Sequence, residues 1–463
     1  MNHGATLLHL RGAAGKDAIY RKISWRLLPL LMLCYTITCM ERVNLGHAQA
    51  QMKDSLALGD SVQLWGAAIF FIGYCLFQLP CNLLFEKIGA SKTLLRLMLC
   101  WGVTASAGAL VRTPFEFYAI RFLLGVFEAG LFPGVILYLT CWYPAARRAR
   151  VIAVFASAAL FASLFGEPLS VVALQHLHQP NGLQGWQWLL LIPGLPAMLL
   201  GIVAYCYLDD SPDDASWLSP FEQLMVEQDL ERDEAALGAP QQDIDDKDES
   251  PSPLAIAWTL LRDPALCLLA AANLLLMTAS YALASWTMQR WNTGMLAQTG
   301  WLALVPGVAG IAGMIAIGYD SDRRHERRGH FIACMVLAAG GLGLAIAADS
   351  GLAWSQAGAL AGLSLAALGV AAAAPLLVAI LTDLLTRQRA AIGIALIGST
   401  GALGGAVGPA LCVRLLAWGG SAVMLSVLVL LVLAAGAVML LALRLAPRRS
   451  GRDDRLSALA HMG

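Results

Sequence analysis

The amino-acid sequence predicts an all-α polytopic membrane protein with twelve transmembrane helices in two pseudo-symmetric six-helix bundles. The first reason is composition, because 58% of the 463 residues are hydrophobic and only 13% are charged. Soluble domains carry about 25% charged residues. The second reason is that twelve apolar stretches each come near the roughly 20 residues that a helix needs to cross a bilayer. A polar segment divides these stretches into two sets of six.

The elements follow one another in a regular order along the chain. The first six stretches lie at residues 27–48, 63–86, 92–111, 115–140, 149–172 and 187–207. The second six lie at 265–288, 299–319, 330–348, 354–383, 390–415 and 420–445. The predicted domains are therefore a polar segment 1–26, a first bundle 27–207, an acidic linker 208–263 with a helix near 220–237, a second bundle 264–445 and a basic tail 446–463.

Lysine and arginine set the expected orientation in the membrane. They gather in alternate loops, on the same side as both termini and the linker, and they are sparse in the other loops. Because cytoplasmic loops carry the excess of positive charge, we expect both termini to be cytoplasmic in a multi-pass protein of the inner membrane. The formal net charge is zero, which argues against nucleic acid as a partner.

Two loops at corresponding places in the two bundles resemble each other. FEKIGASK follows the second stretch and YDSDRRHERRGH follows the eighth, and both place acids beside bases at a helix end. We expect Glu86, Lys87, Asp322 and Arg323 to pair across the two bundles and to favour a closed state on that side. The alternative is that the basic residues only set topology.

Opposite charges inside the apolar stretches are the strongest sign of a functional site. Arg121 and Glu128 lie seven residues apart, on one face of the fourth stretch. A charge facing lipid would cost several kcal/mol, so both should point into the bundle or a hydrated cavity. A substrate or proton site and a static clamp between helices both remain open.

Several motifs together resemble the anion:cation symporter branch of the major facilitator superfamily. They include ERVNLGHA at 41–48, FQLPCNLLFEKIGA at 77–90 and RFLLGVFEAGLFPGVILYLTCWYP at 121–144. DDSPDDASWL, SWTMQ and RAAIGIALIGSTGALGGAVGP extend the similarity over nearly the whole chain. The resemblance implies two bundles that alternate access to a midplane site. It also implies proton-coupled uptake of a small organic carboxylate, as in tartrate, phthalate and hydroxyphenylacetate carriers.

The resemblance also assigns roles to particular residues. It places substrate contact at Arg42, whose planar guanidinium can bind a carboxylate through two hydrogen bonds. Glu41 and Glu128 are the expected proton-coupling acids, and Arg121 is expected to tune Glu128. Glu167 is an additional acid in the fifth stretch that departs from the family pattern, and it is either a third proton carrier or a partner for a cationic or hydroxyl group on the substrate. The further substrate-binding candidates are Tyr74, Gln78, Tyr281, Trp286 and Gln289.

Departures from the family pattern bear on the substrate. Gly398 stands where relatives often have Asn, and the tenth stretch lacks a family Trp. The second bundle should therefore line a less polar pocket, which favours aromatic acids over sugar acids.

Motifs for enzymes, metals and cofactors are missing from the sequence. No cysteine or histidine pair has convincing metal-ligand spacing, and no nucleotide loop or nucleophile elbow appears. We therefore expect no enzyme activity, no metal and no cofactor. The proton-motive force would be the energy source, with sodium left open. Because one chain contains both halves of the site, we expect a monomer. An exporter or antiporter of the same fold is the alternative.

Overall fold

The structure is a computed structural model that describes residues 2–56, 60–177, 182–236, 252–292, 302, 304–349 and 355–445. All regular secondary structure in these ranges is helical. The N-terminal half contains α1 (Asn2–Leu56), α2 (Asp60–Ile88), α3 (Ala90–Ala107), the 3-10 helix η1 (Gly108–Leu110), α4 (Pro114–Glu128), α5 (Leu131–Thr140), α6 (Ala145–His176) and α7 (Gly185–Tyr207). The linker contains α8 (Pro220–Ala236) and α9 (Pro253–Arg262). The C-terminal half contains α10 (Pro264–Asn292), α11 (Val305–Arg324), α12 (Arg328–Asp349), α13 (Ser355–Leu384) and α14 (Arg387–Leu445).

The described helices supply twelve crossing segments. Ten segments are long and apolar enough to span a membrane, α4 and α5 counting as one and α14 as one. α11 is an eleventh segment of 20 residues, with an acidic and basic last turn. α14 supplies the twelfth because its 59 residues contain a turn at Gly419 and Gly420, where φ reaches 70°. This fold confirms the predicted all-α membrane architecture.

The fourth span is broken in the middle. Pro114 starts α4, and the Thr113 hydroxyl accepts a hydrogen bond from the Glu116 amide at 3.3 Å, which caps the helix. The break falls at Gly130, before α5 begins at Leu131. A Cβ on Gly134 would lie 2.2 Å from the Phe85 ring, so glycine allows α5 to pack closely on α2. Glycine thus stands both at the break in this span and at a close contact with α2.

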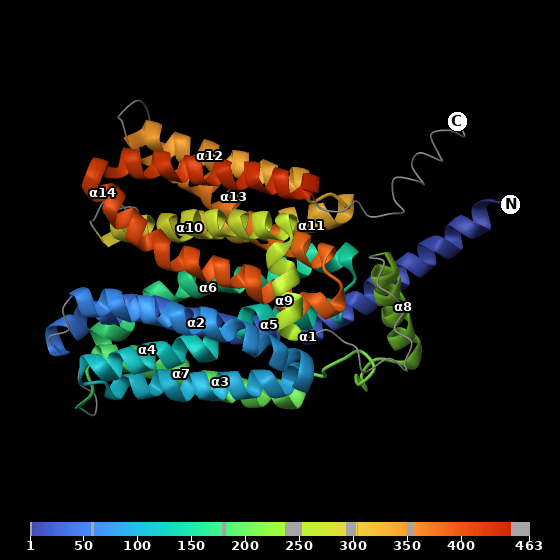
Figure 1. The fold of residues 1–463 in the computed structure, drawn as a ribbon, viewed down its shortest axis with the longest axis horizontal. Coiled ribbons are helices and arrows are strands. Elements are labelled where there is room, and N and C mark those ends of the chain that lie inside the picture. The colour runs from blue at the N-terminus through green and yellow to red at the C-terminus, as the bar shows by residue number, and fades with distance from the viewer. Residues whose placement is uncertain are drawn as a thin grey trace.

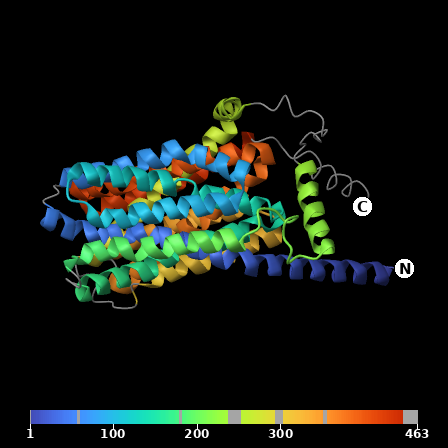
Figure 2. The ribbon, with the colours of Figure 1, turned by 90° about the horizontal axis from the view of Figure 1, so that it is seen from below.

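The two halves lie side by side along two helix seams (Figures 1 and 2). α6 packs on α11 in one seam, and α2 packs on α14 in the other. On the outside of the bundles, many large apolar side chains are exposed, among them Leu33, Phe165, Leu199, Val407 and Leu430. Such an apolar exterior suits contact with lipid.

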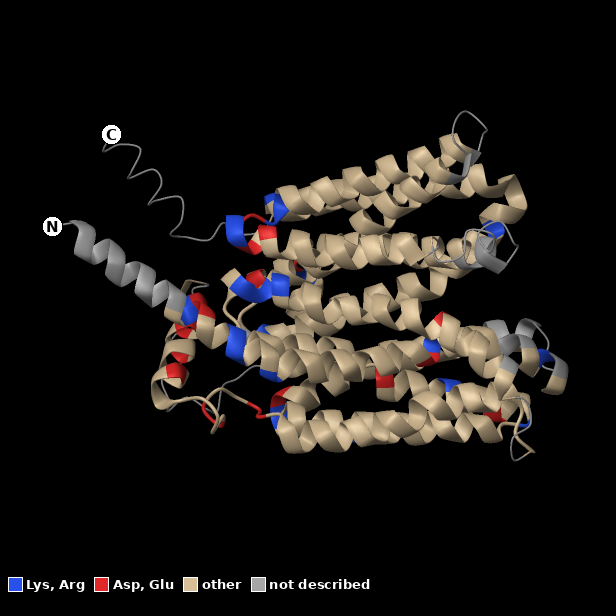
Figure 3. Cartoon of the chain, turned by 180° about the vertical axis from the view of Figure 1, so that it is seen from behind, with Lys and Arg blue, Asp and Glu red and all other residues tan. Residues whose placement is uncertain are grey.

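Charge is concentrated at one end of the bundles, where α8 and the end of α14 lie (Figures 1 and 3). We call it the linker end, and the other end the distal end. α8 is held there by ionic contacts, since Lys16 Nζ lies 2.5 Å from Asp229 and Lys22 Nζ lies 2.8 Å from Glu222. The Trp217 ring stacks on Trp142 at 5.8 Å. The linker is therefore packed against the N-terminal half, and the first span runs unbroken into the polar N-terminal segment.

A candidate substrate and proton site between the halves

Four charged residues of α1 and α4 form two crossed ion pairs in the middle of the N-terminal half. Arg42 Nη2 lies 2.7 Å from Glu128 Oε1. Arg121 Nη1 lies 3.9 Å from Glu41 Oε1. Each helix thus contributes one acid and one base. Neighbours in a helix point about 100° apart, so Glu41 and Arg42 can reach two levels of α4.

The members of this cluster differ in exposure. The Glu41 and Glu128 side chains are 0% and 2% exposed, and Arg121 is 8% exposed. The Arg42 side chain is 28% exposed, although it lies well inside the first span. Arg42 is thus the one member of the four that the protein does not fully enclose. Arg42 is therefore the group best placed to meet an incoming anion.

Arg42 also reaches the other half of the protein. Its Nη1 donates a hydrogen bond of 3.3 Å to the Tyr281 hydroxyl on α10. Its guanidinium carbon lies 5.4 Å from the ring centre of Phe70 and 5.6 Å from that of Tyr74 on α2. Three predicted substrate-binding residues, Arg42, Tyr74 and Tyr281, thus meet at one point between the halves.

Arg121 forms its ion pair with Glu41, and its Nε donates to the Gly66 carbonyl at 3.4 Å. The expected tuning of Glu128 by Arg121 stays a prediction. Seven helical residues separate Arg121 from Glu128 by about 10 Å along the axis, which is too far for direct contact. The adjacent Glu41 and Arg42 of α1 supply nearer partners for both.

Gln78 is brought to the seam rather than to an open pocket. Its side chain is buried, and its Oε1 accepts a 2.9 Å hydrogen bond from the Ser399 hydroxyl on α14. One turn further on, Asn82 Nδ2 donates to the Ala391 carbonyl at 2.9 Å. In this conformation Gln78 and Asn82 hold α2 against α14. A substrate contact at Gln78 stays a prediction.

The remaining predicted residues are Trp286, Gln289 and Glu167. Trp286 is buried on α10, and the Gln289 side chain lies outside the part of the chain that the structure describes. Glu167 is half-buried on α6. It follows Leu160 and Leu164, whose side chains approach Gly310 and Gly307 of α11. Helical spacing therefore places Glu167 on the face of α6 that meets the other half.

At the linker end, Asp322 joins the two halves. Its carboxylate accepts hydrogen bonds from the amides of Ala149 at 3.2 Å and Arg150 at 2.9 Å, in the first turns of α6. The positive end of the helix dipole stabilises an anion there. Asp322 was predicted to pair across the halves, and it does. The other three predicted gating residues, Glu86, Lys87 and Arg323, have exposed side chains.

Two arginines of the basic runs complete this contact. Arg327 Nε lies 2.6 Å from Asp383 of α13, and its Nη2 donates to the Ala145 carbonyl of α6. Arg148 Nη1 donates to the Thr382 carbonyl at 3.1 Å. The run that contains Arg327 was expected to pair across the halves, whereas Arg148 was expected only to set topology. These bonds close the linker end between α6 and the C-terminal half.

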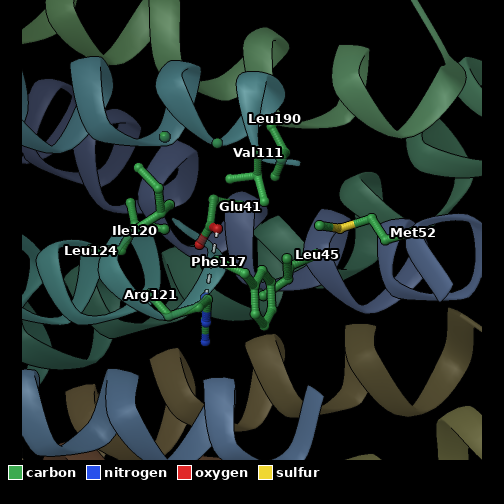
Figure 4. Close-up of a pocket in the computed structure, with 11 residues that line it drawn as sticks. Glu41, Leu45, Met52, Val111, Phe117, Ile120, Arg121, Leu124 and Leu190 are labelled. Atoms are coloured by element: carbon green, nitrogen blue, oxygen red, sulfur yellow. Dashed lines mark ion pairs between the residues drawn. The ribbon is translucent and has the colours of Figure 1, made fainter. Parts of the chain in front are cut away.

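A small pocket lies beside the Glu41–Arg121 pair, inside the N-terminal half (Figure 4). Its walls come from α1, α3, η1, α4 and α7. The lining residues are Glu41, Leu45, Met52, Ala105, Gly108, Val111, Phe117, Ile120, Arg121, Leu124 and Leu190.

Two bundles of membrane-spanning helices with buried, crossed ion pairs inside one of them suit a membrane transporter. The chain matches the Major Facilitator Superfamily over residues 31–363 and 266–460, and it belongs to that family. It is 38% identical over 395 residues to the Agrobacterium vitis protein named "Putative tartrate transporter", covering 85% of this chain and 87% of the relative. It is 35% identical over 397 residues to the Quinolone resistance transporter of Acinetobacter baumannii, covering 85% and 87%.

Solved structures agree on the fold. The proton:xylose symporter XylE superimposes with a TM-score of 0.71, over 90% of this chain and 95% of that one. Sequence identity between the two is 12%, so the likeness concerns the fold alone.

Proposed function

We propose that this protein is a proton-coupled symporter that takes up a small organic carboxylate by alternating access. The observation that carries the proposal is the Arg42–Glu128 ion pair of 2.7 Å. It joins a fixed cation to an acid that can carry a proton, beside the seam between the halves. The name of the tartrate-named relative supports a carboxylate as the transported anion.

Coupling follows from competition for Arg42. An incoming carboxylate can bind the guanidinium through two hydrogen bonds and displace Glu128. Glu128 is then a buried carboxylate without its counter-charge, and such a group takes up a proton rather than remain charged. Release of substrate returns Arg42 to Glu128, which expels the proton. Arg42 stays protonated throughout.

Tyr74 and Tyr281 would line the anion site with Arg42. They come from different halves, so a substrate held by both would favour closure around it. The apolar surroundings, with Phe70 beneath Arg42, suit an aromatic acid. Trp286 and Gln289 stay candidates from the same helix, α10.

The linker end would face the cytoplasm in the inner membrane. Lysine and arginine of alternate loops gather on that side, and cytoplasmic loops hold such an excess. The bonds of Asp322, Arg148 and Arg327 would then close the cytoplasmic gate, and breaking them would open the site inward. The protein would work as a monomer, with no cofactor and the proton-motive force as energy source.

Uptake by purified protein in liposomes tests the proposal. Aromatic and hydroxy carboxylates are screened with an inward proton gradient, and Glu128→Gln is compared with the exposed Glu227→Gln on α8 as a matched control. We expect wild type and Glu227→Gln to concentrate the best carboxylate. Glu128→Gln should still exchange it but not concentrate it. A gradient-driven extrusion of a drug, with no anion uptake, would instead favour the exporter that the name of the Acinetobacter baumannii relative suggests.

A further inference from the structure

The pocket beside Glu41 runs from the ion pair toward the distal end (Figure 4). On α1 its walls include Glu41, Leu45 and Met52, which succeed one another toward the end of that helix. Val111 follows η1 in the loop between the third and fourth spans. α3 starts at the linker end, where Ser91 contacts Asp210 of the linker, so this loop lies at the distal end. The pocket therefore extends from a mid-membrane acid toward the distal end of the protein.

The polar atoms at the inner end of the pocket lack direct partners. Within the described residues, both carboxylate oxygens of Glu41 and Nη1 of Arg121 are buried and make no hydrogen bond. The pair is separated by 3.9 Å, beyond the usual 2.7–3.2 Å of a hydrogen bond. A polar contact of this length is commonly bridged by water. A buried water needs two to four polar partners, and three are available here.

We propose that a water molecule bridges Glu41 and Arg121 in this pocket, and that Glu41 exchanges its proton through it with the distal end. Arg121 donates Nη1–H to the water oxygen, and the water donates O–H to a Glu41 oxygen. In loading, that O–H bond breaks as a new one forms on Glu41. The water then regains a proton from the distal side, so one proton moves inward.

This proposal rests on the proposed proton coupling. It places the two acids in two separate regions of the protein, each with its own route for proton exchange. Glu128 is tied to Arg42, which borders the seam between the halves. Glu41 has no exposed surface, and its pocket is enclosed by helices of the N-terminal half alone. Glu41 can therefore exchange its proton while substrate occupies the seam.

A substitution of Gly108 by alanine can fill part of the pocket without disturbing the backbone. Its φ of −55° suits any residue. A Cβ there would lie 3.2 Å from a methyl of Leu190 and 3.6 Å from Ile120, both pocket residues. Gly436→Ala is the matched control, because its Cβ would meet the Met335 side chain at 3.3 Å in the C-terminal half.

Infrared spectroscopy of the full-length protein tests the water path. The carboxyl band that disappears in Glu41→Gln identifies Glu41, and its hydrogen–deuterium exchange is timed after a switch to D2O. We expect exchange in Gly108→Ala to be about tenfold slower or more, because the bridging water loses its room. Gly436→Ala should match wild type. Equal rates in Gly108→Ala and wild type would overturn the proposal.

Transport by the same variants separates this proposal from the symport mechanism. Gly108→Ala should lose most of its gradient-driven uptake while substrate counterflow stays within about twofold of wild type. If wild type shows no gradient-driven uptake but Glu41 exchange still slows in Gly108→Ala, the symport proposal fails and the water path stands. Unchanged gradient-driven uptake in Gly108→Ala would contradict a coupling role for the path.

Discussion

The amide of Gln78 fills the space that a side chain at position 398 would need. A Cβ on Gly398 would lie 2.1 Å from Gln78 Nε2, which is far inside van der Waals contact. The glycine therefore allows α2 and α14 to approach, and it leaves Gln78 in place to accept the hydrogen bond from Ser399. The sequence indicated that Gly398 removes a polar contact to substrate. The structure shows that it also makes room for the Gln78 amide.

Gly398→Ala should weaken this seam. The methyl group must displace the Gln78 amide and break its bond with Ser399, and overpacking of this kind costs about 1–3 kcal/mol. Thermal unfolding in detergent should show a lower Tm than wild type. Gly343→Ala is the control, because its Cβ would meet nothing within 4 Å, and its Tm should be unchanged or higher. A Tm for Gly398→Ala equal to that of the control would show that the seam adjusts without strain.

Asp210 should stabilise the linker by capping α3. Its Oδ1 accepts a 2.8 Å hydrogen bond from the Ser91 amide, and Gly89 with φ of 90° lets the chain pass close beside it. Asp210→Ala removes this cap and the favourable charge at the helix N-terminus, at a cost of about 1 kcal/mol. We expect a lower Tm, whereas Asp213→Ala, with an exposed side chain, should behave like wild type. If Tm falls equally in both variants, the negative charge of the linker, and not the cap on α3, stabilises this region.

Closure of the linker end should depend on pH through Asp322. This residue lies beyond the apolar part of α11, and burial raises its pKa from 3.8 to about 6 against the opposing effect of Arg327. In an open state, where water reaches the carboxyl, the pKa should return toward 3.8. The closed state then binds the proton more tightly, so acidification favours closure. This extra stability of the closed state is fully present below pH about 4 and is lost as pH rises through about 6.

Distances between spin labels on α6 and α13 can follow this equilibrium from pH 7 to pH 5. We expect the closed population to increase on acidification in wild type. Asp322→Asn should remove most of the dependence, and Asp213→Asn should retain it. A closed population that falls on acidification in wild type would reverse the sign and exclude Asp322 as the controlling group.

The sequence alone predicted the twelve crossings, because hydropathy and span length depend on single segments. It also selected Arg121 and Glu128, since charges in apolar helices are rare and costly, and the family resemblance added Glu41 and Arg42. Their crossed pairing could not be predicted, because it depends on how α1 and α4 are rotated against each other. Hydropathy also separated the two crossings within α14, which are two helices joined by the turn at Gly419 and Gly420.

The linker-end contacts show the same limit. Asp322 forms the predicted ion pair across the halves, with Arg150 Nε at 3.9 Å, but its hydrogen bonds from α6 come from backbone amides. Arg148 and Arg327 bond to backbone carbonyls of the facing half. Backbone partners leave no pattern in the sequence, so these contacts appear only when the helices are placed.

Calorimetry tests the central claim most directly, because it counts the protons bound with the substrate. Binding of the best-transported carboxylate is measured at one pH in buffers of different ionisation enthalpy, for wild type, Glu128→Gln and Glu227→Gln. If substrate takes Arg42 from Glu128, wild type and Glu227→Gln should take up a proton on binding, and Glu128→Gln should bind the carboxylate without that proton. The same proton uptake in Glu128→Gln as in wild type would contradict the account.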